Sequence, residues 1–357
     1  MPRWQRAARW LACSPCWAER GAASISPSLP PTLRDRAADW GATLQGRAPA
    51  TGPRMWPPEL RAAFPGARVL ETWTGEGAAF ARYRSPGGPL FLKYLPAGWR
   101  NPRAAERLRR ESRYLRELAP HAPVSHAPHL HSAARAEPPL AHLLTVDRTD
   151  ATWGWGAFVT DAQREGALLD VVRLLAGLHA FWAGPGQPML KGRWTWQPQE
   201  VLARSAPVSP PDAAGPGAAE ALRAAAQALP SLLARAPVWT LVHGDIHAGQ
   251  VLWPRDGGPP ELIDYGQLHP SVPGEDLAHL LALRLDPAER TRLGPALRAA
   301  YGEALADRGL RLSAAELAAQ ERAGLALNLL STARQAQRRE SSGVQQALAA
   351  AVAAWWE

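Results

Sequence analysis

The sequence has 357 residues, of which 46% are apolar and 20% charged, enough for one large domain or two medium ones with a real core. No run of about 18 apolar residues occurs, so we expect no membrane-spanning segment and a cytoplasmic protein. The two cysteines, Cys13 and Cys16, cannot cross-link a fold of this size or form a four-thiolate zinc site. Of the 40 basic residues only Lys93 and Lys191 are lysines, so each is a candidate for a role that arginine cannot fill.

Positive charge is concentrated in the first 54 residues. This segment carries eight arginines against three acids and accounts for +5 of the formal net charge of +8. The rest of the chain is no more basic than an ordinary domain, and we expect no nucleic-acid partner. Residues 1–54 also lack helical or strand periodicity. This predicts a disordered extension, or an untranslated segment if Met55 is the true start.

The first folded segment reads as an antiparallel sheet. Apolar stretches separated by turns rich in glycine and proline predict three strands, over residues 68–74, 78–84 and 89–95. Two more strands are expected at 130–136 and 141–146. These strands and the helix between them define a predicted N-terminal lobe over residues 55–146.

The helix in this lobe is predicted to begin at Asn101 and Pro102, a cap residue followed by a first-turn proline. Its inward stripe recurs every three or four residues. The stripe consists of Ala104, Leu108, Glu111, Leu115 and Leu118. Because Glu111 is a carboxylate on an apolar stripe, we expect it to have a cationic partner.

The remainder, residues 147–357, is predicted to be a mostly helical lobe. Beyond Asp161, apolar residues at helical spacing indicate a long helix, and a strand is expected at 238–242. Further helices are expected near 218–235, 275–285, 288–306, 313–336 and 341–355. Residues 184–217 are rich in proline and glycine and predict an ordered insertion or long loop. The fold class is therefore α+β, with a small sheet lobe, a helical lobe and a cleft between them.

The most informative stretch is LVHGDIHAGQVLWPRDGGPPELIDYGQ, residues 241–267. Asp245 and Asp264 lie 19 residues apart, at the ends of short predicted strands that we expect to be adjacent. We therefore expect the two acids to meet at one end of a hairpin. Phosphoryl transfer needs such a pair, because one carboxylate orients the attacking hydroxyl while the other binds magnesium.

Residues 243–250 and 264–266 resemble the catalytic and metal-binding loops of the aminoglycoside phosphotransferase family. The stretch LLAGLHA at 174–180 is similar to one that precedes the catalytic loop in this family, and Asp276 in GEDLAHLL resembles its loop-bracing acid. The resemblance covers roughly residues 66–330 of the sequence. It implies a protein-kinase-like two-lobe fold and a kinase of small molecules that uses ATP and Mg²⁺.

The resemblance also implies a role for each matching residue. Asp245 becomes the catalytic base, and Asp264 and Gln250 become the metal ligands. Gln250 departs from the usual Asn, but its amide oxygen can still bind magnesium. The form HGDxHxGQVL is also similar to the loop of maltokinases, although Tyr265-Gly266-Gln267 differs from their Phe-Glu-Gly.

Four further residues are carried over to the nucleotide. Lys93 occupies the position that contacts the α- and β-phosphates, and Glu111 becomes its partner. This agrees with the residues themselves, since a compact ammonium fits between a carboxylate and phosphate oxygens where a guanidinium does not. Gly75 and Gly77 would let the first hairpin approach the phosphates.

The acceptor and the oligomeric state stay open. The acceptor is a small-molecule hydroxyl, aminoglycoside-like, on a sugar or on an amino alcohol. Aromatic walls would favour a sugar, and Trp153, Trp155, Trp194 and Trp196 could stack on one. The alternative is a pseudokinase that binds nucleotide or a partner without turnover. A protein kinase is disfavoured, because no activation-loop segment follows Asp264.

Overall fold

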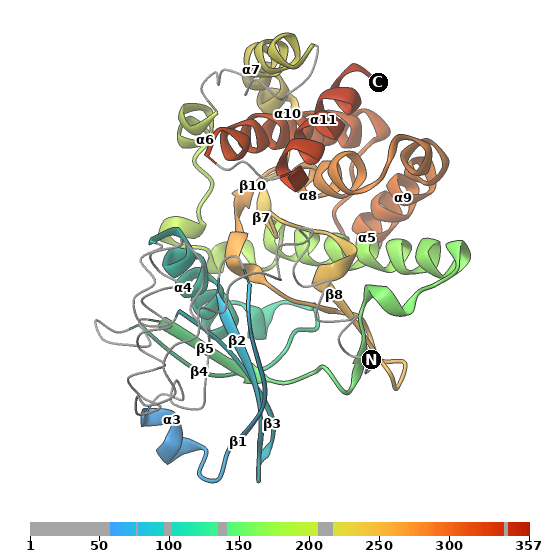
Figure 1. The fold of residues 1–357 in the computed structure, drawn as a ribbon. Helices are drawn as coiled ribbons and strands as arrows, with labels where there is room; N and C mark the ends of the chain where they lie inside the picture. The colour runs from blue at the N-terminus through green and yellow to red at the C-terminus, as the bar shows by residue number, and fades with distance from the viewer. Residues whose placement is uncertain (1–57, 76–77, 96–101, 135–140, 206–216, 339–341) are drawn as a thin grey trace.

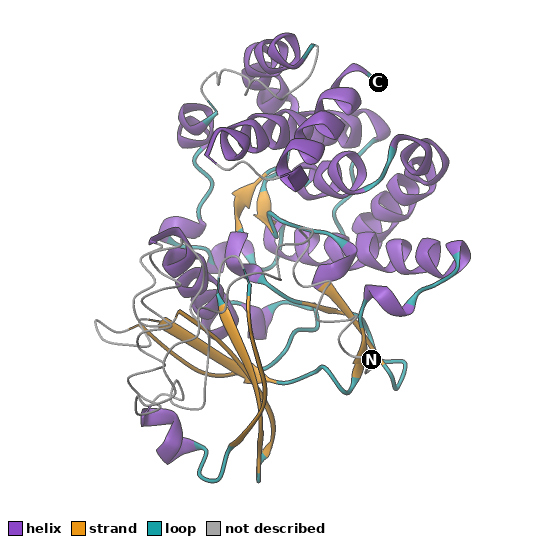
Figure 2. Cartoon of the chain, viewed as in Figure 1, coloured by secondary structure: helices purple, strands orange, loops and turns teal. Residues whose placement is uncertain are grey.

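The computed structural model describes residues 58–75, 78–95, 102–134, 141–205, 217–338 and 342–357. The extension predicted over residues 1–54, with both cysteines, lies outside them. Figures 1 and 2 show an antiparallel sheet with a long helix beside it and, above, a larger region built from helices. The predicted α+β class with a sheet part and a helical part is confirmed.

The N-terminal sheet has five antiparallel strands in the order β1-β2-β3-β5-β4. They are β1 (Arg68–Thr74), β2 (Ala79–Ser85), β3 (Gly88–Leu95), β4 (His129–Ala134) and β5 (Ala141–Val146). All five predicted strands exist, but β2 and β3 extend one residue further into their turn than predicted. There Ser85 pairs with Gly88, whose φ of 123° closes the tight connection. The last two residues of the strand predicted at 130–136 lie outside the described residues.

Alternation along β3 separates its two faces. Leu90, Leu92 and Tyr94 are buried in a cluster that also contains Leu60 of the short helix α3 (Pro58–Ala63). Since successive side chains of a strand point to opposite faces, Lys93 projects away from this cluster. The sheet therefore presents the Lys93 ammonium on the face opposite its own core.

Helix α4 (Pro102–Glu117) packs against β3, β4 and β5. Every member of its predicted inward stripe is buried, including the Glu111 side chain, which is 6% exposed. The predicted cap Asn101 lies outside the described residues. Helix and strand together thus bring an acid and a lysine to one place.

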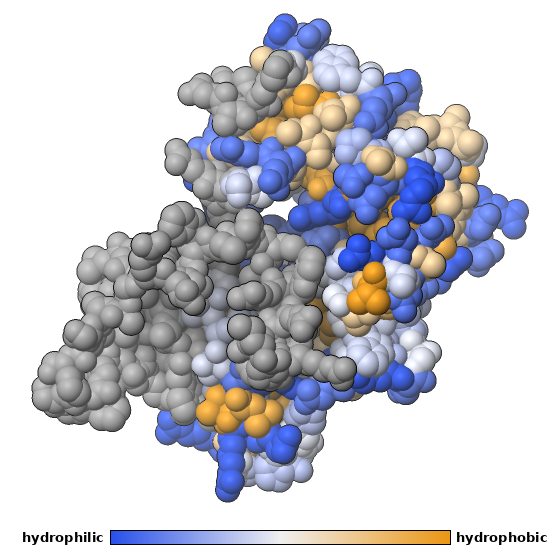
Figure 3. All heavy atoms as spheres, turned by 45° about the vertical axis from the view of Figure 1, so that its right-hand side comes forward, coloured by the Kyte–Doolittle hydropathy of each residue, from blue (hydrophilic) through white to orange (hydrophobic). Residues whose placement is uncertain are grey.

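The helical region contains one central helix and several surrounding ones. They are α5 (Asp161–Ala183), α6 (Pro198–Arg204), α7 (Ala218–Arg235), α8 (Gly274–Ala278), α9 (Pro287–Asp307), α10 (Ala314–Arg338) and α11 (Ser342–Trp356). Among the described helices, α5 alone is long and apolar enough to cross a membrane, but most of its apolar window is buried. It packs against α9 in the largest core cluster, as a core helix does. On the face in Figure 3 the described surface is mainly hydrophilic.

The structure adds detail to two predicted segments in this region. The helix expected at 275–285 is α8 followed by a π-helical turn, η9 (His279–Leu283). The segment 184–217 is structured where it is described, with α6 and the single 3₁₀ turns η4 (Gln187–Met189) and η5 (Gly192–Trp194). Its residues 206–216 lie outside the described part.

Five short strands form two further small sheets. β7 (Thr240–Val242) pairs with β10 (His269–Ser271), and β6 (Thr152–Trp153), β8 (Val251–Pro254) and β9 (Glu261–Leu262) form the other. The predicted hairpin is therefore β8–β9, and β7 belongs to a different sheet. The expectation that β7 lies beside this hairpin as an adjacent strand is wrong, because β10 occupies its pairing edge.

Candidate active site

Lys93 lies between two carboxylates. Its Nζ is 2.6 Å from Oε2 of Glu111 and 2.7 Å from Oδ1 of Asp264. Burial alone would lower the pKa of Lys93, but the two carboxylates raise it further than burial lowers it. The same ammonium overcomes the effect of burial on Asp264 and holds its pKa below the ordinary aspartate value. The lysine and Asp264 are therefore both charged at neutral pH.

Asp264 has an unusual backbone. Its φ of 63° is left-handed, and no other non-glycine residue in the described ranges has a positive φ. Such a conformation is unfavourable for a residue with a Cβ and concentrates at functional sites. It occurs between β9 and the 3₁₀ turn η8 (Tyr265–Gln267), where the chain turns sharply.

Gln250 approaches the same carboxylate. It ends the 3₁₀ turn η7 (Ala248–Gln250), and its Nε2 is 3.4 Å from Oδ2 of Asp264. Its amide oxygen Oε1 is buried and has no hydrogen-bond partner within the described structure. A buried oxygen that accepts no hydrogen bond is costly. This oxygen is therefore available to coordinate a metal ion or to accept a hydrogen bond from a bound molecule.

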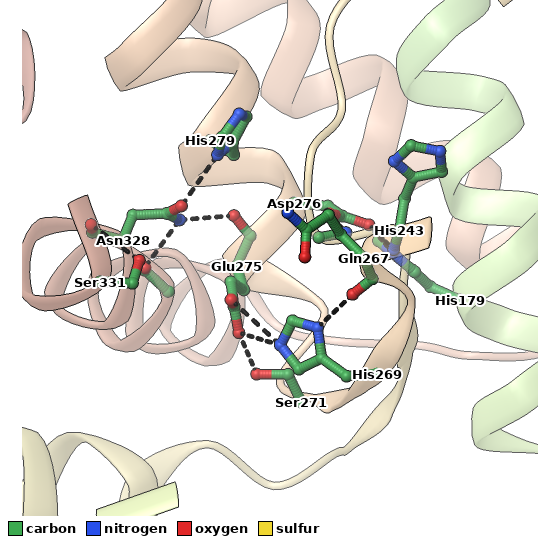
Figure 4. Close-up of polar contacts among 12 residues, drawn as sticks. His179, His243, Gln267, His269, Ser271, Glu275, Asp276, His279, Asn328 and Ser331 are labelled. Atoms are coloured by element: carbon green, nitrogen blue, oxygen red, sulfur yellow. Dashed lines mark hydrogen bonds and ion pairs between the residues drawn. The ribbon is translucent and has the colours of Figure 1, made fainter. Parts of the chain in front are cut away.

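The loop that carries Asp245 is held from behind by Asp276 of α8. The buried Asp276 carboxylate accepts the backbone N–H groups of His243 at 2.6 Å and Gly244 at 2.8 Å. It also bonds Nε2 of His179, the histidine of the LLAGLHA stretch, at 3.0 Å (Figure 4). Asp276 is therefore placed as the brace that the resemblance implies.

Two features fix the shape of this loop. Gly244 has a φ of 81°, and a Cβ at this position would lie 2.6 Å from the carbonyl oxygen of Gln267. Only glycine satisfies both conditions. The ring of His243 lies 2.9 Å from the carbonyl oxygen of Ile263, so its Nε2–H donates and joins this loop to the one that carries Asp264. His243 therefore has a structural role in linking the two loops.

Asp245 lies at the mouth of the loop, with its side chain 38% exposed. Its Oδ1 accepts Nη2 of Arg284 at 2.9 Å and is 3.5 Å from Nε2 of His279. Burial favours the protonated form, but these two groups outweigh it and hold the pKa of Asp245 well below its ordinary value. Its charge also acts on Asp264, so the two acids share one site.

The remaining residues singled out from the sequence differ in where the structure places them. Gly75 ends the first strand region, and its N–H donates to the carbonyl of Ala78 at 2.9 Å. Gly77 lies outside the described residues. Lys191 is exposed. Among the tryptophans, Trp194 is buried in the core, whereas Trp153 is 44% exposed under the guanidinium of Arg255.

Sequence reasoning missed His279 and Arg284, which contact the predicted base directly. No helical periodicity joins them, because residues five apart lie on different faces of an α-helix. The signal that could have found them is their position just after the GEDLA segment that carries the brace Asp276.

The sheet, the helical region and this cluster of lysine, acids and amide define a phosphotransferase of the kinase-like type. The sequence profile of the phosphotransferase enzyme family matches residues 75–315, well over half of the chain. The chain therefore belongs to this family, and the resemblance to the aminoglycoside phosphotransferases is confirmed. No curated protein sequence matches the chain.

Solved structures of small-molecule kinases share the fold. A microcompartment-associated aminopropanol kinase is 15% identical with a TM-score of 0.57, covering 81% of this chain and 90% of that one. The aminoglycoside phosphotransferase APH(4)-Ia, as a thermostable mutant with ADP and hygromycin B, is 14% identical with a TM-score of 0.55, covering 83% and 97%. A choline/ethanolamine kinase family protein from Mesorhizobium loti is 16% identical with a TM-score of 0.53, covering 85% and 92%.

Proposed function

We propose that this protein transfers the γ-phosphoryl group of ATP, with Mg²⁺, to a hydroxyl of a small molecule in the cytoplasm. The observation that carries the proposal is the contact of Lys93 with both Glu111 and Asp264, at 2.6 and 2.7 Å. These residues come from the sheet, from α4 and from the loop after β9. A structural ion pair needs one acid, whereas a charged lysine between two acids is poised to exchange one of them for phosphate oxygens.

The residues present fit a magnesium ion. Carboxylate and amide oxygens are the ligands that this hard cation prefers. Asp264 would supply the carboxylate, and Gln250, whose Nε2 contacts that carboxylate at 3.4 Å, would supply its unpartnered Oε1. When bound, magnesium neutralises the charge that develops on the phosphate oxygens. The chain's own contribution is to hold the two side chains in contact, Asp264 through its left-handed backbone and Gln250 through η7.

Asp245 is the proposed base. The acceptor hydroxyl donates its hydrogen bond to the carboxylate, and its oxygen forms the new bond to the γ-phosphorus while the bond to the leaving ADP oxygen breaks. The hydroxyl proton passes to Asp245. Because its pKa is well below the ordinary value, Asp245 is ionised at neutral pH and orients the hydroxyl more than it competes for the proton.

The acceptor is proposed to be aminoglycoside-like, a sugar or an amino alcohol. The structural neighbours include an aminoglycoside phosphotransferase and an aminopropanol kinase, which supports an amino-containing alcohol as the acceptor. The described tryptophans give little support for a sugar-stacking wall. Trp196, for example, lines an apolar groove with Trp239 and Pro230 instead.

The experiment is a screen for ADP release from ATP over a panel of aminoglycosides, sugars and amino alcohols. We expect release with one class of acceptor, its loss in Asp245→Asn, and no change in Arg292→Gln. Arg292 is a suitable control because it pairs with Glu165 on the surface at 3.3 Å. ADP release by Asp245→Asn at the wild-type rate would contradict the assignment. ATP binding without release on any acceptor would favour the alternative without turnover.

A further inference from the structure

The turn after α8 is π-helical. In an α-helix, two residues five positions apart project about 140° from each other, since each residue adds about 100°. A π-helix bonds residues five apart and brings their side chains to the same side. η9 (His279–Leu283) is such a turn, and it places His279 beside Arg284, whose Nε donates to Nε2 of the ring at 3.2 Å.

His279 is itself fixed by Asn328 of α10. The Asn328 amide Nδ2 donates to the carbonyl oxygens of Glu275 at 2.8 Å and Gly324 at 2.9 Å. Its Oδ1 must then accept, so Nδ1 of His279 carries the hydrogen of their 2.9 Å bond (Figure 4). Nε2 of the same ring then faces Arg284 at 3.2 Å and Oδ1 of Asp245 at 3.5 Å.

The approach of α10 that makes this possible depends on two glycines. A Cβ on Gly274 would lie 1.9 Å from the carbonyl oxygen of Gln320, and a Cβ on Gly324 would lie 2.1 Å from the carbonyl oxygen of Gly274. Helices α8 and α10 therefore touch backbone to backbone. This contact sets Asn328 next to the π turn.

We propose that His279 and Arg284 are positioning residues that hold the Asp245 carboxylate in its working orientation and ionised. The inference rests on the proposed function, because it assigns these residues to the base of that reaction. Arg284 contacts both His279 and Oδ1 of Asp245, so a chain of contacts runs from α10 to the base. Oδ2 of Asp245 has no hydrogen-bond donor within the described residues, which leaves it free for the acceptor hydroxyl.

Four titratable or charged groups surround Asp245. His279 lies in η9 and Arg284 directly after it. His247 lies in the same loop as Asp245, and Asp264 lies in the loop after β9. Burial lowers the pKa of His247 to about 4, so this ring is neutral at physiological pH. Arg284 is then the one permanent cation among these four groups.

The direct test measures the ionisation of Asp245 without any acceptor. The full chain is labelled with ¹³C at the aspartate carboxyl carbons, the Asp245 resonance is assigned by its loss in Asp245→Asn, and pH is titrated. We expect a midpoint below the free value of about 3.9 in the wild type. In Arg284→Gln the midpoint should rise by about 1 to 3 pH units, and Arg284→Lys should restore most of the difference.

His279→Phe keeps the ring volume, and should raise the midpoint by less than Arg284→Gln because Arg284 stays nearby. Arg292→Gln is the matched control and should leave the midpoint unchanged. An Asp245 midpoint in a folded Arg284→Gln equal to that of the wild type would overturn the proposal. The titration needs no turnover. The positioning proposal can therefore be contradicted while the phosphotransferase assignment stands, and the phosphotransferase assignment can be contradicted while the positioning proposal stands.

Discussion

The ammonium of Lys93 lies 2.7 Å from Oδ1 of Asp264, although 171 residues separate them along the chain. Lys93 reaches this point because β3 alternates its side chains, and Asp264 because its backbone takes a left-handed turn. Lys93 comes from the sheet and Asp264 from the loop after β9, so the sheet and the helical region meet at this pair. The pair is therefore the most informative place to test the account.

The first prediction concerns the side chain of Lys93. The space between Glu111 and Asp264 admits a compact ammonium, and the broad planar guanidinium of Lys93→Arg cannot replace it in the same position. We expect Lys93→Arg and Lys93→Met each to lose about 100-fold or more in kcat/KM for ATP. Lys191→Arg, at an exposed lysine, should behave as the wild type. An active Lys93→Arg would show that the charge alone is needed.

Most of the fold and the main acids of the site could be predicted from the sequence. Turns rich in glycine and proline mark the ends of the strands. Glu111 is an acid on the apolar stripe of α4, and this position indicated that it needed a cationic partner. The lysine that fills this role was predicted from its rarity and from the family resemblance. These signals are local, or depend on spacing within one element.

What was missed depends on contacts between elements. The partner of β7 is β10, a strand of three residues around Pro270 that no alternation marks. The contacts of His279 and Arg284 with Asp245 depend on a π turn. The sequence does not mark this turn, because the composition does not change between α8 and η9. Asn328 is brought close only because Gly274 and Gly324 let two helices touch. Such relationships are decided by tertiary packing, which a local pattern does not encode.

The second prediction compares two glycines with nearly the same backbone. Gly244 has a φ of 81° and Gly257 a φ of 80°, but only Gly244 would place a Cβ against another atom. Gly257→Ala should lose about 1 kcal/mol in the free energy of unfolding, the cost of the left-handed backbone. Gly244→Ala should lose roughly 3 kcal/mol or more, because overlap with Gln267 is added. Urea unfolding measures both, and equal losses would contradict the role of the overlap.

The third prediction concerns acid stability and Asp276. Burial favours its protonated form, but bonds from His179 and the Gly244 N–H prevail and hold the pKa of Asp276 below the ordinary value. A group with a depressed pKa in the folded state stabilises the fold above its unfolded pKa of about 3.9, and this stability is lost as pH falls toward the folded value.

We therefore expect Asp276→Asn to be destabilised at pH 7 by roughly 2 to 4 kcal/mol, since one donor then faces the amide NH₂. The difference from the wild type should shrink below about pH 4, where the Asp276 carboxylate of the unfolded wild type begins to protonate while that of the folded state is still ionised. Asp286→Asn is the control, because Asn also caps a helix and Asp286 caps α9 on the surface. Chemical unfolding at several pH values measures these differences, and a constant gap down to low pH would contradict the account.

The central claim is that Lys93, Glu111, Gln250 and Asp264 converge on one magnesium-bound triphosphate. Calorimetric titration of ATP into the full chain, with and without Mg²⁺, tests it most directly in the wild type and in Asp264→Asn. The account predicts that magnesium strengthens ATP binding to the wild type and that this gain is lost in Asp264→Asn. An Asp264→Asn protein that keeps the full magnesium-dependent gain would contradict it.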